Sequence, residues 1–205
     1  MKKILGVLLV SSLVGCGGSG DDNDSSVIPP VEPPTLSRDV CYLMSTTKGD
    51  ISLAIDVTNM PITGSNFTRY VDKAFYDGTL FHRAVSNFVI QGGGFTTGLV
   101  NKPGDAPIKN EASVGISNER GTLAMARTSA PDSATSQFFI NILDNPQLDA
   151  SSTSDGYAVF GEVIDGMDVV DQISITPTHS VDGFTNVPVE DVLINSVTEM
   201  ACPAS

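Results

Sequence analysis

Between residues 40 and 200 the chain is a succession of short segments typical of β-strands, and this pattern constrains the fold more than any other feature. Apolar and polar residues alternate over 49–56, as expected of a strand with one buried face, and this segment forms a predicted hairpin with 40–44. The other predicted strands lie at residues 80–85, 88–92, 121–126, 137–142, 159–163 and 192–197. Short strands of this kind predict a mainly β fold, a closed antiparallel barrel.

Two segments with helical periodicity interrupt the strands. The first follows Thr63 and Ser65, which are its predicted N-caps. Its apolar positions have the spacing i, i+3, i+4 and i+7 of an amphipathic helix and are Phe67, Tyr70, Val71 and Ala74. The second helix is predicted at residues 166–173. We expect these two helices to cap the barrel.

Composition excludes several functional classes. The 205 residues include 24 Asp and Glu against 11 Lys and Arg, and this net charge of −13 disfavours nucleic acid as a partner. His82 and His179 are the only histidines and no CxxC pair occurs, so no metal site is expected. The run Gly92–Gly94 lacks the Lys-Ser/Thr pair of a phosphate cradle and predicts a tight turn. The Pro- and Thr-rich stretch around His179 predicts a loop.

Residues 1–15 have the pattern of an export signal. Lys2 and Lys3 precede an apolar stretch of about 11 residues, whereas a membrane-spanning helix needs about 20. The stretch from Leu13 to Cys16, LVGC, resembles the bacterial lipobox, and the resemblance implies that Cys16 becomes the lipidated N-terminus. The alternative is an ordinary secretory signal that merely lies near Cys16.

Residues 16–36 are predicted to be a tether between the lipid and a domain at residues 37–205. GGSGDDNDSS is flexible and like-charged, and VIPPVEPP favours the extended polyproline II conformation. Cleavage removes two lysines, which leaves 24 acidic and 9 basic residues, so the lipid and not surface charge must hold the protein on a membrane. We expect a lipid-anchored protein of a Gram-negative envelope, on the outer membrane and facing the periplasm.

Cys41 and Cys202 enclose nearly all of the predicted domain. Exported proteins fold in an oxidising compartment, so these two residues are candidates for a disulfide between the first and last strands. The alternative is two free thiols on edge strands.

Three sequence blocks carry the strongest functional signal. They are FHRAVSNFVIQGG at 81–93, GTLAMAR at 121–127 with SQFFI at 136–140, and GYAVFG at 156–161 followed by Gly166-Met167. Together they closely resemble the signatures of the cyclophilin family of peptidyl-prolyl cis-trans isomerases, over about 160 residues and in family order. The segment PIKNEA at 107–112 makes the chain most similar to the bacterial exported branch.

The resemblance implies a closed eight-stranded antiparallel β-barrel capped by two α-helices, an isomerase that needs no cofactor, and Arg83 as its catalytic residue. It also implies a proline pocket, a glutamine that binds the substrate backbone and supports Arg83, main-chain contacts to the residues before proline, and flanking groove residues. By this resemblance the pocket is formed by Phe88, Met125, Phe139 and Leu148, and the glutamine is Gln91. The main-chain contacts come from Ala126 and Arg127. The flanking groove residues are Gln137 and Tyr157, and Tyr157 replaces a family histidine.

The chemistry of prolyl isomerisation needs little more than these residues. Rotation about an Xaa-Pro amide breaks no bond but crosses a barrier of about 18–20 kcal/mol. An apolar pocket for the ring and a guanidinium near the prolyl nitrogen weaken the amide resonance as the bond twists. The expected partners are proline-containing segments of unfolded or newly exported proteins, bound by a monomer.

Gln147 and the alternative functions add to this interpretation. Gln147 occupies the position before Leu148 where relatives carry an aromatic residue that matters for cyclosporin, so we expect weak sensitivity to that drug. A chaperone or adaptor that binds proline-containing segments without important catalysis is the alternative function, and an envelope lipoprotein with an idle site is a third.

Overall fold

The computed structural model describes residue 32 and residues 34–203, and the fold is that of this part of the chain. The predicted signal at 1–15, Cys16 and most of the predicted tether lie outside the described residues. The chain from Glu32 on belongs to one compact unit. Within the described part, no helix is both long and apolar enough to cross a membrane.

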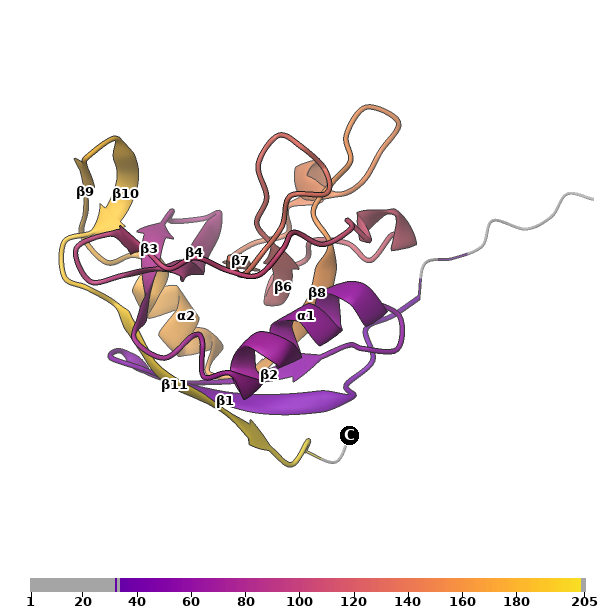
Figure 1. Cartoon of the computed structure of the whole chain (residues 1–205), viewed down its shortest axis with the longest axis horizontal. Helices are drawn as coiled ribbons and strands as arrows, with labels where there is room; N and C mark the ends of the chain where they lie inside the picture. The colour runs from indigo at the N-terminus through magenta and orange to yellow at the C-terminus, as the bar shows by residue number, and fades with distance from the viewer. Residues whose placement is uncertain (1–31, 33, 204–205) are drawn as a thin grey trace, which may run out of the picture. The chain divides into compact units, whose positions relative to one another are not determined.

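Eight antiparallel strands close into a barrel, with β1, β2 and β11 side by side at its base in Figure 1. The pairing of β3 with β4 closes the ring, and the short strand β5 (Val100–Asn101) extends the sheet from β4. The predicted closed eight-stranded antiparallel barrel is therefore confirmed. Around the ring the strands are β3 (Thr79–Ala84), β11 (Leu193–Met200), β1 (Val40–Thr46), β2 (Gly49–Ile55), β8 (Val159–Asp165), β6 (Thr122–Met125), β7 (Phe138–Asn141) and β4 (Val89–Thr96).

Two α-helices, α1 (Pro61–Asp72) and α2 (Met167–Ser174), pack on the barrel, and the described part also contains two short 3-10 helices, η1 (Ala112–Val114) and η2 (Pro146–Leu148). Phe67 of α1 is fully buried, with its ring 5.0 Å from Tyr76, 5.6 Å from Phe138 and 5.4 Å from Phe160. Burial of one such ring contributes about 2–3 kcal/mol, so α1 is held mainly by its apolar face.

The N-terminus of α1 is not capped as predicted. The helix begins at Pro61, and neither Thr63 nor Ser65 is its N-cap. Instead the carboxylate of Glu111, 48 residues further along the chain than Thr63, accepts hydrogen bonds from the Thr63 amide and hydroxyl at 2.7 Å each. It also accepts one from the Ile62 amide at 3.1 Å. A long-range carboxylate therefore replaces the local side-chain cap.

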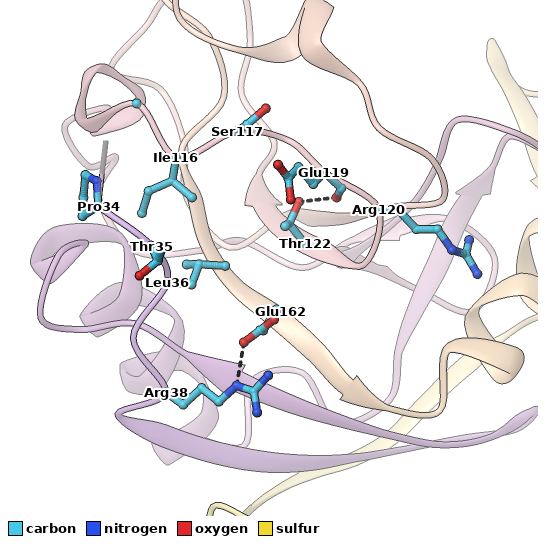
Figure 2. Close-up of a pocket in the computed structure, with 11 residues that line it drawn as sticks. Pro34, Thr35, Leu36, Arg38, Ile116, Ser117, Glu119, Arg120, Thr122 and Glu162 are labelled. Atoms are coloured by element: carbon cyan, nitrogen blue, oxygen red, sulfur yellow. Dashed lines mark hydrogen bonds and ion pairs between the residues drawn. The ribbon is translucent and has the colours of Figure 1, made fainter. Parts of the chain in front are cut away.

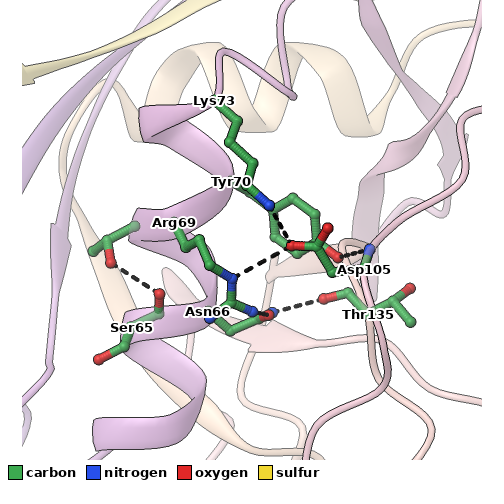
Figure 3. A network of polar contacts seen from close by, with 8 residues as sticks. Ser65, Asn66, Arg69, Tyr70, Lys73, Asp105 and Thr135 are labelled. Atoms are coloured by element: carbon green, nitrogen blue, oxygen red, sulfur yellow. Dashed lines mark hydrogen bonds and ion pairs between the residues drawn. The ribbon is translucent and has the colours of Figure 1, made fainter.

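A network of polar contacts from α1 fixes two loops (Figure 3). Asp105 accepts hydrogen bonds from Lys73 at 2.7 Å and from Arg69 at 3.4 Å, and the bond from Lys73 is the main reason that the pKa of this carboxyl lies below its ordinary value. Asn66, on the same helix, donates to the Thr135 carbonyl at 2.7 Å. The helix thus holds the loops around residues 105 and 135 against the barrel.

Two local predictions are wrong. The predicted loop around His179 is a hairpin of β9 (Thr178–Val181) and β10 (Phe184–Pro188). The predicted tight turn at Gly92–Gly94 is an internal part of β4. A Cβ added to Gly93 would lie 2.8 Å from a Tyr76 ring carbon, and one on Gly94 would lie 2.4 Å from Gln137 Cγ. Neighbouring side chains leave no room for a Cβ at either position, and Gly93 also has a φ of +82°, which favours glycine although the chain does not reverse there.

The first and last strands of the unit are joined covalently. Cys41 in β1 forms a disulfide with Cys202, just after β11, across a sequence separation of 161 residues. Before β1, the Ser37 amide donates to Asp56 Oδ2 at 2.8 Å and Leu36 packs against apolar side chains of the barrel. The Thr35 carbonyl also accepts a hydrogen bond from Asn59 Nδ2 at 3.2 Å, so the chain contacts the rest of the unit from Thr35, two residues before the predicted domain start.

Candidate functional site

Strand register places the central site residues side by side. Arg83 in β3 pairs with Gln91 in β4, and Gln91 in turn pairs with Phe139 in β7. Directly paired residues of neighbouring antiparallel strands project from the same face of a sheet. Three residues that are 8 and 48 positions apart in the sequence thus form a row across the outside of the barrel.

This row borders a cavity of about 110 Å³, which we call the central cavity. Phe139 and Val89 are nearly fully buried and form its apolar base together with a small cluster of apolar side chains that is separate from the main core. The residues that line the central cavity are Arg83, Phe88, Val89, Gln91, Ala126, Arg127, Phe139, Leu148 and Tyr157. An apolar hollow with charged and amide groups at its edge suits a ring that carries a polar amide.

Arg83 is positioned by its neighbours. Its Nη1 donates to Gln91 Oε1 at 3.5 Å, a long hydrogen bond, and Gln91 Nε2 donates to Gln137 Oε1 at 3.1 Å. The guanidinium also lies 5.8 Å from the centre of the Phe88 ring. These contacts hold the charge at the edge of the cavity without neutralising it.

Arg127 occupies the opposite side of the central cavity and fixes its wall. Its guanidinium lies 4.6 Å from the centre of the Tyr157 ring, and its Nε donates to the Gly156 carbonyl at 2.8 Å. Its Nη1 donates to the Thr128 carbonyl at 3.0 Å. The Tyr157 ring in turn meets Phe139 edge to face at 5.6 Å. The side chain of Arg127, and not only its main chain, therefore shapes the cavity.

The structure departs from the sequence-based expectation at Met125. This side chain belongs to the main core of the barrel and does not line the central cavity. Side chains alternate along β6, so Ala124 and Ala126 contact the apolar cluster behind the cavity, whereas Met125 faces the interior. Val89 takes the place in the cavity that was assigned to Met125. The same alternation could have identified it, since Val89 lies two residues before Gln91.

Two further cavities adjoin the central one, and we call the three together the groove. A cavity of about 390 Å³ lies beyond Arg83 and Gln91 and is lined on its far side by residues 183–185 of the β9–β10 hairpin. A cavity of about 240 Å³ lies beyond Arg127 and is lined by the hydroxyl residues Thr128, Ser133 and Thr135. Gln91 and Gln137 line both flanking cavities, so Gln137 lies beside the central cavity and not within it.

His82 lies under the 390 Å³ cavity and is 5% exposed. Its ring packs 4.7 Å from that of Phe95, and within the described residues its Nδ1 has no hydrogen-bond partner. Burial lowers the pKa of His82 to about 4. The imidazole is therefore neutral at physiological pH and adds no charge to the groove.

Gln147 does not reach the central cavity. The residue is exposed, and its amide donates to Asn145 Oδ1 at 2.9 Å. Of the two neighbours Gln147 and Leu148, only Leu148 lines the central cavity.

A cavity of about 490 Å³ lies elsewhere, between residues 34–38 and residues 115–122 (Figure 2). The ion pair of Arg38 with Glu162, at 2.7 Å, closes one side of it. None of the predicted site residues within the described part of the chain lines this cavity. Residues 32 and 34–203 contain no group of three or more His, Cys, Asp or Glu that could hold a metal ion.

Comparison with known proteins agrees with this geometry. Residues 41–199 match the family model "Cyclophilin type peptidyl-prolyl cis-trans isomerase/CLD". A peptidyl-prolyl cis-trans isomerase of Acinetobacter baylyi is 57% identical over 154 residues, which are 75% of this chain and 82% of the relative. Peptidyl-prolyl cis-trans isomerase B of Escherichia coli is 51% identical over 156 residues, 75% of this chain and 95% of the relative.

A crystal structure of a cyclophilin type peptidyl-prolyl cis-trans isomerase of Cryptosporidium parvum has a similar fold. It superposes with a TM-score of 0.69 at 26% identity and covers 80% of this chain and 99% of that one. The same protein has been crystallised in the presence of the dipeptide Ala-Pro. With a family match over residues 41–199 and relatives at half or more identity, this chain belongs to the cyclophilin-type peptidyl-prolyl cis-trans isomerases.

Proposed function

We propose that this isomerase accelerates the rotation of Xaa-Pro bonds in unfolded or newly exported proteins of the cell envelope, with Arg83 as its catalytic residue. The observation that carries the proposal is the position of Arg83 at the edge of an apolar cavity, beside Gln91. The guanidinium is permanently charged, so it is a donor at any physiological pH.

The reaction follows from the groups around the central cavity. Phe88, Phe139 and Leu148 hold the proline ring and keep water away from the amide. As the C–N bond twists, the prolyl nitrogen loses its resonance with the carbonyl and becomes a hydrogen-bond acceptor. Arg83 then donates to this nitrogen more strongly than in the planar ground state, so it lowers the barrier and does not merely bind the substrate. Gln91 positions the guanidinium for that step.

Substitution of Arg83 tests the mechanism. We expect Arg83→Ala to lower kcat/KM for a short Xaa-Pro peptide by about 10²-fold, as for the loss of one transition-state donor. Arg38→Ala, which removes an exposed guanidinium that does not line the groove, is the matched control and should leave kcat/KM unchanged. Circular dichroism of both variants checks folding.

The same assay separates catalysis from binding alone. If the wild type binds the peptide and does not accelerate its isomerisation, the protein is an adaptor or chaperone, and the proposed activity on envelope proteins is wrong. If wild type and Arg83→Ala are equally fast, the activity stands and the role of Arg83 is wrong.

The proposed location is the periplasmic face of the outer membrane, through lipid on Cys16, with the protein as a monomer. The support is the order of charged segment, apolar segment and LVGC at the N-terminus. Replacement of Cys16 by Ser should move the protein from the membrane fraction to the soluble fraction. Light scattering of the detergent-solubilised protein gives the oligomeric state, and a dimer mass would contradict the monomer.

A further inference from the structure

The groove is positively charged in a protein that is otherwise strongly acidic. Of the residues that the structure describes, Arg83 and Arg127 line the three cavities and no Asp or Glu does. The whole chain has 24 acidic and 11 basic residues, so a surface region without any carboxylate stands out from the rest. His82 is neutral at physiological pH and leaves the two arginines as the charged groups of the groove.

Five of the seven basic side chains elsewhere in the described part have carboxylate partners, and the other two, Lys102 and Lys109, have none there. The residues in ion pairs there are Arg38, Lys48, Arg69, Lys73 and Arg120. Within residues 32 and 34–203, neither Arg83 nor Arg127 forms such a pair. Arg83 donates to an amide oxygen and Arg127 to two carbonyl oxygens, and these neutral acceptors orient a guanidinium without cancelling its charge.

Arg127 is placed to receive a negative charge beside the proline. Its side chain is held by Tyr157 and Gly156, so little rotamer freedom remains to be lost when a ligand binds. It lines both the central cavity and the 240 Å³ cavity, whose other side chains are hydroxyl, amide and methyl groups. A carboxylate in that cavity would meet the guanidinium and no opposing acid.

We infer that the groove selects acidic proline-containing segments, in which an Asp or Glu next to the proline pairs with Arg127. This inference rests on the proposed isomerase function and names its substrate class. The net charge of −13 opposes it at long range, but at physiological ionic strength fields between exposed charges fade within about 8 Å. Contact with Arg127 lies inside that distance, so the local attraction dominates.

Peptides that differ by one charge test the selectivity. Each has Glu, Gln or Lys two residues before, directly before or directly after the proline, and kcat/KM is measured with the full chain. We expect Glu to exceed Gln by about fivefold at one or more of these positions, the upper range for a solvent-accessible ion pair, with Lys the slowest.

Three variants identify the source of any preference. Arg127→Gln should abolish the ratio of Glu to Gln peptides, and Arg127→Lys should keep part of it, because the charge remains and the carbonyl contacts are lost. Arg38→Gln removes one positive charge outside the groove and should leave the ratio unchanged. The ratio is taken within each variant, so a partial loss of folded protein does not affect it.

The outcomes distinguish a failure of the acidic selectivity from a failure of the isomerase function. If the wild type accelerates all peptides equally, or if Arg127→Gln keeps the preference for Glu, the acidic selectivity is wrong and the isomerase function stands. If the wild type accelerates none of the peptides, the proposed function itself fails.

Discussion

The long-range cap on α1 makes a prediction about stability that local sequence signals would not give. We expect Glu111→Ala to destabilise the protein although Glu111 lies outside the groove and outside the helix. The variant leaves the Thr63 amide and hydroxyl without their acceptor, and Thr63 is fully buried, so water cannot readily replace it.

The expected loss of unfolding free energy follows from the three hydrogen bonds that the Glu111 carboxylate accepts. A hydrogen bond to a charged group contributes about 1.5–3 kcal/mol, and a negative charge at a helix N-terminus adds about 0.3–1 kcal/mol. These terms overlap, and the bond from Ile62, at 3.1 Å, is longer than the two from Thr63 and belongs to an exposed residue. We therefore expect a loss of about 3 kcal/mol for Glu111→Ala. Glu111→Gln keeps one acceptor oxygen and should cost about 1–2 kcal/mol.

Urea unfolding followed by circular dichroism measures these changes, with the slope m checked for constancy. Glu119→Ala removes an exposed acid whose side chain makes no hydrogen bond in the described part, and it should change stability by less than about 0.5 kcal/mol. Thr63→Val removes the hydroxyl donor and should reduce the effect of Glu111→Ala by about 1 kcal/mol. Equal effects at Glu111 and Glu119, or no coupling to Thr63, would refute the reasoning.

Two further predictions concern pH and the groove. His82 has a pKa of about 4 in the folded protein against about 6.5 when unfolded, so the unfolded state takes up the proton first and stability falls as pH drops from 6.5 to 4, by about 3 kcal/mol in total. Urea unfolding at pH 7 and pH 4 should show a smaller fall for His82→Gln, and an identical fall would contradict this role. Gly94→Ala places a Cβ 2.4 Å from Gln137 Cγ, which must move away from Gln91 and disturb Arg83. We expect kcat/KM to fall on the order of tenfold, and an unchanged value would show that Gln137 does not position the site.

The regular elements of the barrel could be predicted because each depends on local periodicity. The barrel strands and both helices were predicted close to their observed bounds, except for the end of β4, which runs four residues beyond the predicted residue 92, and the N-terminus of α1. Thr63 and Ser65 are good caps by residue type, but Glu111 supplies a charged acceptor from a distant loop and Pro61 already favours the first helical position. A contact between two residues that are 48 positions apart cannot be recognised from the spacing of neighbouring residues.

The β9–β10 hairpin had a signal that was not used. Asp182 and Gly183 link Val181 directly to its partner Phe184, and both have positive φ angles, 51° and 84°. An Asp-Gly pair between two strands is a strong sign of a two-residue hairpin turn. The polar composition of β9 concealed it, because this strand is largely exposed and no apolar alternation arises along it.

The groove was predicted in outline and corrected in detail. The motifs identified the row Arg83, Gln91 and Phe139, whose proximity is a matter of strand register. Met125 was assigned to the pocket from the family resemblance, but it faces the core, whereas its neighbours on β6 contact the apolar cluster behind the cavity. Local spacing could not indicate that the Arg127 guanidinium lies over the Tyr157 ring, because that contact depends on how the loop before Tyr157 returns to the barrel.

The disulfide between Cys41 and Cys202 turns the folded unit into a covalent ring. A protease that cuts once in an exposed loop, such as residues 151–155, therefore releases no fragment, because both pieces remain tied through the sulfur bridge. The nicked molecule keeps its mass on a gel without reductant and separates into two bands only when thiol is added. If the chain is anchored at Cys16, such a cut would also leave both pieces on the membrane.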